Sequence, residues 1–129
     1  MPSILGDTLQ NFLKQIEQRS ITVGVLGLGY VGLPLAVAFA EAGFKVIGLD
    51  VNDKRVDRLN SGDSYIADVP TQALAKQVEA GRLTATTEGR KIAEMDAVVI
   101  CVPTPLSKTR DPDVSYIMAA AEEVSRHIH

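Results

Sequence analysis

Three glycines stand at the spacing of a dinucleotide-binding turn in the segment VLGLGYVGLP, residues 25–34. In such a turn the first glycine, here Gly27, makes the bend from strand to helix. The second, Gly29, lets the backbone approach a pyrophosphate, and the third, Gly32, lets the helix pack closely on the strand. The spacing alone does not decide between this chemistry and a glycine-rich turn that serves packing only.

The residues around the glycines could supply the rest of such a site. The N–H groups of Gly29, Tyr30 and Val31 would face a diphosphate, with the positive end of the helix dipole behind them. A second apolar run, FKVIGLD, ends about twenty residues later in Asp50, whose carboxylate can accept both hydroxyls of an adenosine ribose. This carboxylate would repel a 2′-phosphate, which favours NAD. Arg55 keeps NADP open, because a nearby arginine is how such sites accommodate that phosphate.

Alternating strands and helices must position these groups. Apolar runs predict strands over residues 21–26, 44–50, 82–87 and 97–102. Helical patterns and capping residues predict helices over about 30–42, from residue 52 or 53 to about 60, from Thr71 to Gly81, and from Asp113 to 128, with a short helical turn around Ile92. Right-handed crossovers then give a Rossmann-type, doubly wound parallel α/β sheet with strand order 3-2-1-4. The sheet is expected to be truncated, because a further strand should pair beside the fourth.

This strand order predicts where a ligand binds. Ligands of open α/β sheets lie outside the carboxyl ends of the strands, at the point where the strand order reverses. The loops that meet there are GLGYVGLP and VPTP. Val102, Pro103 and Thr104 are therefore expected to flank a dinucleotide, with the Thr104 hydroxyl offered to a ribose or phosphate oxygen.

Two helices carry apolar stripes that predict packing. Residues 1–20 are expected to form an amphipathic helix that packs on a domain formed by residues 21–129; its stripe is Leu5, Leu9, Phe12, Leu13 and Ile16. The last helix is expected to face the core through Ile117, Ala121, Val124 and Ile128.

Composition excludes several classes of function. A chain of 129 residues with a net charge of -3 forms one domain and lacks the basic surface of a nucleic-acid or acidic-membrane binder. The absence of a long apolar stretch and of a leader pattern predicts a cytoplasmic protein without a membrane segment. Cys101 lies in an apolar strand without a basic partner, and with His127 and His129 it gives no metal-ligand spacing. We therefore expect neither a catalytic nor a metal-binding residue. Tyr65 is either a packing anchor or a pocket wall.

These motifs together resemble the NAD-binding domain of the UDP-glucose/GDP-mannose dehydrogenase family. The resemblance is carried by the segment that runs from GLGYVGLP to DSYIADV, by AVVICVPTPL and by DPDVSYI. The first helix and VPTPLSKTRDPDVSYI are most similar to the UDP-N-acetylglucosamine 6-dehydrogenase branch. The resemblance implies oxidation of the C6 alcohol of a nucleotide sugar to a carboxylate, with two NAD as hydride acceptors. It implies NAD binding by Gly27, Gly29, Tyr30, Val31, Asp50, Arg55, Val102, Pro103 and Thr104.

The resemblance also implies what this chain lacks. The family's catalytic cysteine, its assisting lysine and asparagine, and its nucleotide-sugar pocket belong to a later domain, and Cys101 does not match that cysteine. We expect the N-terminal piece of a longer dehydrogenase, inert alone, with the UDP-sugar bound only by the full-length enzyme. A free-standing dinucleotide-sensing module and another NAD-linked dehydrogenase are the alternatives. The uncovered edge of AVVICV predicts homo-oligomers.

Overall fold

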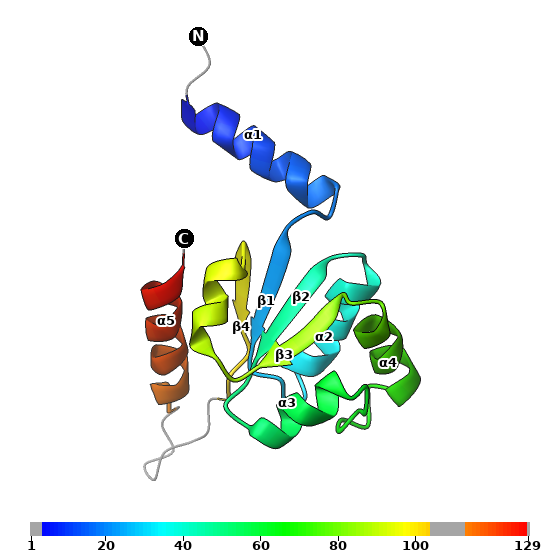
Figure 1. The fold of residues 1–129 in the computed structure, drawn as a ribbon. Coiled ribbons are helices and arrows are strands. Elements are labelled where there is room, and N and C mark those ends of the chain that lie inside the picture. The colour runs from blue at the N-terminus through cyan, green and yellow to red at the C-terminus, as the bar shows by residue number, and fades with distance from the viewer. Residues whose placement is uncertain (1–3, 104–112, 129) are drawn as a thin grey trace.

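Four parallel strands and five α-helices make up the described part of the chain, residues 4–103 and 113–128 of a computed structural model (Figure 1). The strands are β1 (Thr22–Leu26), β2 (Lys45–Leu49), β3 (Leu83–Thr86) and β4 (Ala97–Ile100). The helices are α1 (Ile4–Glu17), α2 (Gly32–Glu41), α3 (Asp53–Asn60), α4 (Thr71–Glu79), α5 (Ser115–His127) and a 3-10 helix, η1 (Gly89–Glu94).

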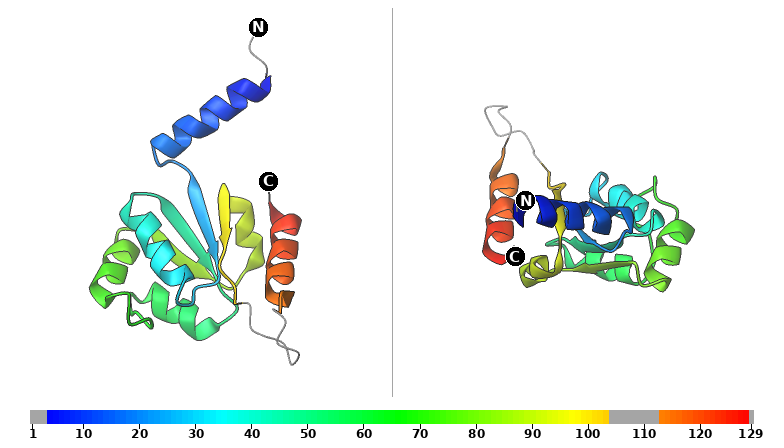
Figure 2. Two further views of the ribbon diagram at one scale, coloured as in Figure 1. Left: turned by 180° about the vertical axis from the view of Figure 1, so that it is seen from behind. Right: turned by 90° about the horizontal axis from the view of Figure 1, so that it is seen from above.

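The strand order is β3-β2-β1-β4, with every pair parallel, which confirms the predicted Rossmann-type sheet. In the centre of the sheet, Val25 on β1 lies opposite Gly48 on β2 and Val99 on β4. One face packs against α2, α3 and α4, while the other packs against η1 and α5 (Figure 2). Because all four strands are parallel, their carboxyl ends point to the same edge of the sheet, where the loops meet.

Helix caps explain where the short helices begin. The Asn52 side chain accepts hydrogen bonds from the N–H groups of Lys54 and Arg55, which confirms it as the cap of α3. The predicted cap of α4, Thr71, is wrong: Thr71 is already the first helical residue, and its hydroxyl accepts a hydrogen bond from the Ser64 N–H instead. The N-cap is Pro70, whose ring fixes φ in the extended backbone and makes no side-chain capping bond.

The helix α1 extends away from the sheet, and the prediction that it packs on the domain is wrong (Figures 1 and 2). Leu9, Phe12 and Leu13 of the predicted stripe are exposed, whereas Ile16 is packed against the core. The physical reason is that α2 already covers β1 and β2 on one face of the sheet.

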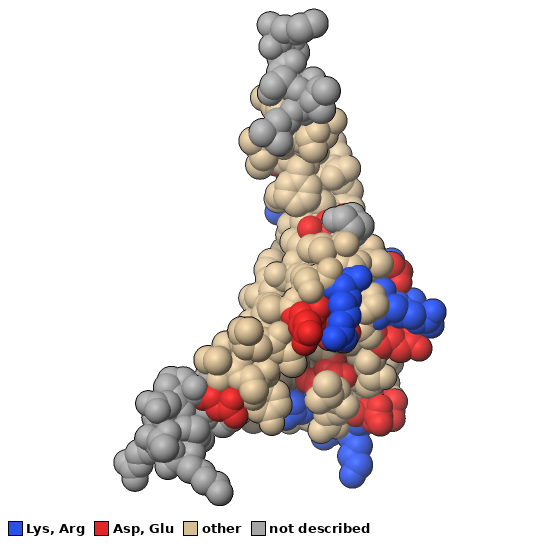
Figure 3. Space-filling view, turned by 90° about the vertical axis from the view of Figure 1, so that its left-hand side faces the viewer, with Lys and Arg blue, Asp and Glu red and all other residues tan. Residues whose placement is uncertain are grey.

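The β4 side of the sheet is less covered than the sequence predicts. Every residue of β4 is partly or fully exposed, with Ile100 38% exposed, because β4 pairs only with β1 in the described part of the chain. The predicted stripe of α5 is wrong in part: Val124 packs against the core as expected, but Ile117, Ala121 and Ile128 are exposed, and the helix buries Ala120 instead. Seen from the side of α5, much of the surface below α1 carries no charged side chain (Figure 3).

We expect this exposed strand edge to drive self-association at high concentration, because unpaired edge strands template pairing with another chain. Ile100→Lys places a charge on the β4 edge and should shift sedimentation toward monomer. Thr84→Lys is the matched control, since it puts the same charge on the exposed opposite edge, strand β3. Wild-type protein that sediments only as monomer at high concentration would contradict this expectation.

Candidate functional site

A cleft of about 600 Å³ lies at the carboxyl ends of β1, β2 and β4. It brings together the predicted site residues of the described chain: Gly27, Gly29, Tyr30, Val31, Asp50, Arg55, Val102 and Pro103. Thr104 lies outside the described residues. Segments separated by about seventy residues in the sequence thus form one site, as expected for the switch point of a doubly wound sheet.

The glycines of the turn have three different environments. Gly27 adopts a φ of +95°, and a side chain there would also collide with the backbone of Cys101. A Cβ at Gly32 would overlap the carbonyl oxygen of Gly27, so this glycine permits the close contact of helix and turn. A Cβ at Gly29 would meet only the Arg55 guanidinium, at 3.9 Å. The first and third glycines are therefore required by the fold, while the second faces open space in the cleft.

The backbone N–H groups of Gly29, Tyr30 and Val31 donate to no acceptor among the described residues. They precede α2, whose first turn has no acidic side chain. Partial positive charge from the helix dipole and free donors therefore meet at one wall of the cleft, which suits an anion such as a diphosphate.

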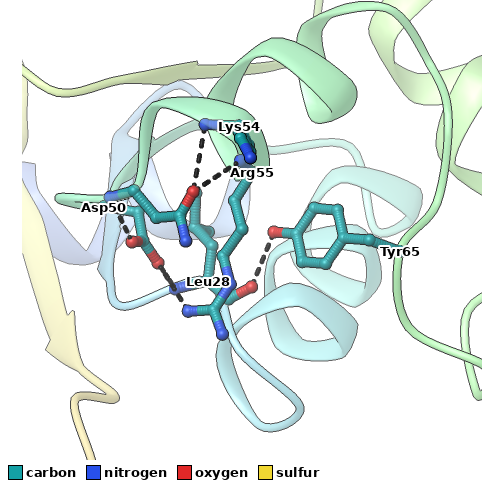
Figure 4. Close-up of polar contacts among 6 residues, drawn as sticks. Leu28, Asp50, Lys54, Arg55 and Tyr65 are labelled. Carbon is teal, nitrogen blue, oxygen red and sulfur yellow. Dashed lines mark hydrogen bonds and ion pairs between the residues drawn. The ribbon is translucent and has the colours of Figure 1, made fainter.

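The Asp50 carboxylate is buried at the end of β2 and is held from three directions (Figure 4). Its Oδ2 accepts from the Leu28 N–H at 2.8 Å, and its Oδ1 accepts from the Asn52 N–H at 2.9 Å. The Arg55 guanidinium lies 3.5 Å from Oδ2. A carboxylate offers about four lone-pair sites, so acceptor capacity is left for a ligand hydroxyl. The bond to Leu28, which the sequence did not predict, ties the glycine turn to β2.

Tyr65 is a packing anchor rather than a wall of the cleft, which decides between the two roles that the sequence left open. Its hydroxyl donates to the Leu28 carbonyl at 2.6 Å, and its ring packs against the core (Figure 4). Burial, and secondarily the charge of Asp50, raise the pKa of Tyr65 to about 12, although Arg55 and Arg58 act in the opposite direction. The phenol is therefore a neutral donor at physiological pH.

Helix α5 supplies a wall that the sequence did not predict. Tyr116, Ala119, Ala120 and Glu123 line the cleft, together with Val51 and Cys101. The α5 residues have the spacing of one helical face, so the sequence contains a pattern that indicates this wall. The stripe beside it is more apolar and therefore gives the stronger prediction of a packed face. Burial raises the pKa of the Cys101 thiol, which disfavours the reactive thiolate.

None of the helices in residues 4–103 and 113–128 is long and apolar enough to cross a bilayer. Within the same ranges, no three His, Cys, Asp or Glu side chains are grouped so that they could hold a metal ion.

Comparison with known proteins places residues 21–129 on the model of the UDP-glucose/GDP-mannose dehydrogenase family, NAD binding domain. The UDP-N-acetyl-D-mannosamine dehydrogenase of Salmonella typhi is 44% identical over 105 residues, which are 81% of this chain and 24% of that protein. A UDP-glucose dehydrogenase from Pyrobaculum islandicum superposes with a TM-score of 0.78 at 39% identity, over 83% of this chain and 25% of its own.

The crystal structure of a ternary complex of GDP-mannose dehydrogenase from Pseudomonas aeruginosa gives a TM-score of 0.76 at 36% identity, over 79% of this chain and 24% of its own. This chain thus spans about a quarter of the length of the curated relatives it matches. The names of these relatives contain different sugars, so the similarity fixes the family and not the sugar.

The glycine environments predict opposite outcomes for one substitution at two positions. Gly32→Ala should lower the free energy of unfolding by about 2 kcal/mol or more, because its Cβ overlaps rigid backbone. Gly29→Ala should change it by less than about 0.5 kcal/mol, because its Cβ enters open space. Urea denaturation of both variants measures the difference, and equal losses of stability would contradict the separate roles.

The raised pKa of Tyr65 predicts a loss of stability in alkali. Because the folded-state pKa lies above the ordinary 10.0, the contribution is fully present below about pH 10 and is lost as the pH rises through about 12. Thermal unfolding across this range should show a fall in stability that Tyr65→Phe reduces. Identical pH profiles for the two proteins would show that the Tyr65 hydroxyl is not protected by folding.

Proposed function

This chain belongs to the UDP-glucose/GDP-mannose dehydrogenase family, and we propose that it forms the NAD-binding part of a nucleotide-sugar 6-dehydrogenase. Such an enzyme oxidises the C6 alcohol of a UDP-sugar to the carboxylate with two NAD. We further propose UDP-N-acetylglucosamine or a similar UDP-N-acetyl sugar as substrate. This choice is supported by the resemblance of VPTPLSKTRDPDVSYI to the UDP-N-acetylglucosamine 6-dehydrogenase branch and by the N-acetyl sugar in the name of the Salmonella typhi relative.

One observation carries the proposal: free N–H donors and a buried carboxylate face the same cleft. The donors of Gly29, Tyr30 and Val31 suit the diphosphate of NAD, with the dipole of α2 behind them. The carboxylate of Asp50 suits the two hydroxyls of the adenosine ribose, because an ionised carboxylate accepts strong hydrogen bonds. The open space at Gly29 gives the diphosphate room to approach. The residues present therefore fit the cofactor.

The other walls would enclose the rest of the dinucleotide. Val102 and Pro103, at the end of β4, provide apolar surface on one side of the cleft, and Tyr116 and Ala119 of α5 provide it on the other. Burial of apolar surface adds affinity without specifying charge. Bound NAD would supply the hydride acceptor, while these residues orient it and exclude water.

The pairing of Arg55 favours NAD over NADP. Its guanidinium lies 3.5 Å from the Asp50 carboxylate, so its charge is already directed to that group. A 2′-phosphate would have to compete with Asp50 for Arg55 and would lie close to the carboxylate charge. Repulsion between these two anions weakens NADP binding.

We propose that the described part binds cofactor without turning over substrate. Its cysteine, Cys101, is partly buried with a raised pKa, which does not suit a nucleophile. The match to about a quarter of the relatives' length supports the same division of labour, in which other segments of a longer chain bind the sugar.

Calorimetric titration with NAD and NADP tests the cofactor site. NAD should bind at least about tenfold more tightly than NADP, because hydrogen bonds to a charged group contribute about 1.5–3 kcal/mol each. Asp50→Ala should weaken NAD binding by about tenfold or more. It should also reduce the ratio of NAD affinity to NADP affinity, which a general loosening of the turn would leave unchanged.

The matched control is Glu79→Ala, which removes an exposed carboxylate at the end of α4, outside the cleft. It should leave both affinities unchanged. Failure of both dinucleotides to bind at millimolar concentration would overturn the cofactor site, and tighter binding of NADP would overturn the role assigned to Asp50.

A further inference from the structure

Leu28, between the first two glycines of the turn, is held at both of its backbone polar groups. Its N–H donates to Asp50 Oδ2 at 2.8 Å, and its carbonyl accepts from the Tyr65 hydroxyl at 2.6 Å (Figure 4). Its side chain is fully buried, with methyl groups that occupy the space above Gly48, where a Cβ would meet them at 2.7 Å. The residue therefore has little freedom to rotate.

The bond to Tyr65 has a geometric consequence for the next residue. The Leu28 carbonyl and the Gly29 N–H belong to one trans peptide group, and in such a planar group the two point in opposite directions. Fixing the carbonyl toward Tyr65 therefore directs the Gly29 N–H away from Tyr65. Gly29 lines the cleft, and its N–H donates to no acceptor among the described residues. One hydroxyl outside the cleft thus sets the direction of a donor inside it.

Tyr65 is itself held in place by the end of α3. The Arg58 guanidinium lies 5.8 Å from the centre of the Tyr65 ring, donates to the Ser64 carbonyl at 2.7 Å and pairs with Asp63 at 3.0 Å. These contacts fix the Tyr65 ring and the two residues that precede it. With a pKa near 12, the hydroxyl keeps its proton for the Leu28 carbonyl at physiological pH.

We propose that Tyr65 is a positioning residue for the cofactor diphosphate, acting through the Leu28–Gly29 peptide group without contacting the ligand. The inference rests on the proposed function, since it assumes that the turn binds a dinucleotide. Asp50 holds the peptide group before Leu28 and Tyr65 holds the one after it, so the two side chains have separate effects. Asp50 also faces the ribose, whereas Tyr65 affects only the diphosphate.

The test removes the Tyr65 hydroxyl alone. Tyr65→Phe should weaken binding of NAD and of ADP-ribose by about threefold to tenfold, the equivalent of one neutral hydrogen bond. Adenosine, which has no diphosphate, should bind with unchanged affinity, measured by amide NMR titration. In the unliganded variant the Gly29 amide resonance should shift and exchange faster with solvent, while the Gly81 amide, at the distant end of α4, should stay unchanged.

Ser61→Ala is the matched control, because it removes a hydroxyl that donates to the Asp57 carbonyl at the end of α3 without contacting Leu28 or Tyr65. It should leave the Gly29 amide and the affinity for ADP-ribose unchanged. An unaltered Gly29 amide in Tyr65→Phe, or equal weakening of adenosine and ADP-ribose, would overturn the positioning role. Because the amide is read without ligand, failure of the wild-type chain to bind NAD would overturn the proposed function separately.

Discussion

The hydrogen bond from the Leu28 N–H to the Asp50 carboxylate joins two segments 22 residues apart, and the shape of the cleft depends on it. A buried carboxylate without partners is very costly, so its burial requires several donors at once. Two backbone N–H groups and the Arg55 guanidinium supply them. The same group that would recognise a ribose therefore also fixes the turn that would recognise a diphosphate.

This coupling explains why the site is built on the sheet and not on the loops alone. The parallel pairing of β1 with β2 places Leu26 opposite Leu49, so the chain leaves both strands at the same level. The Gly27 N–H then donates to the Leu49 carbonyl, which continues the pairing one residue beyond β1. The turn begins from this rigid edge, and Gly29, Tyr30 and Val31, which follow it, line the cleft.

The two ends of the described chain differ from this well-packed centre. The core around β1 and β2 buries large side chains completely, whereas α1, β4 and α5 leave apolar side chains exposed. The sequence predictions agree with the structure in this centre and differ from it at the two ends. Elements near β1 and β2 were predicted closely, because short-range signals dominate there, such as the Asn52 cap and the glycines that follow helix ends. The packing of α1 and α5 was predicted only in part, because a helical stripe does not specify its partner.

By itself the sequence determined the strand order, the glycine turn and the cleft residues that follow β1, β2 and β4, because hydrophobic period and glycine spacing are local properties of the chain. Only the tertiary structure decided how that turn is held. The partners of Leu28 lie 22 and 37 residues away, at Asp50 and Tyr65, and no sequence pattern relates these positions. A hydrogen bond between a side chain and a distant backbone group depends on the distance and angle that packing creates, so it exists only after the chain has folded.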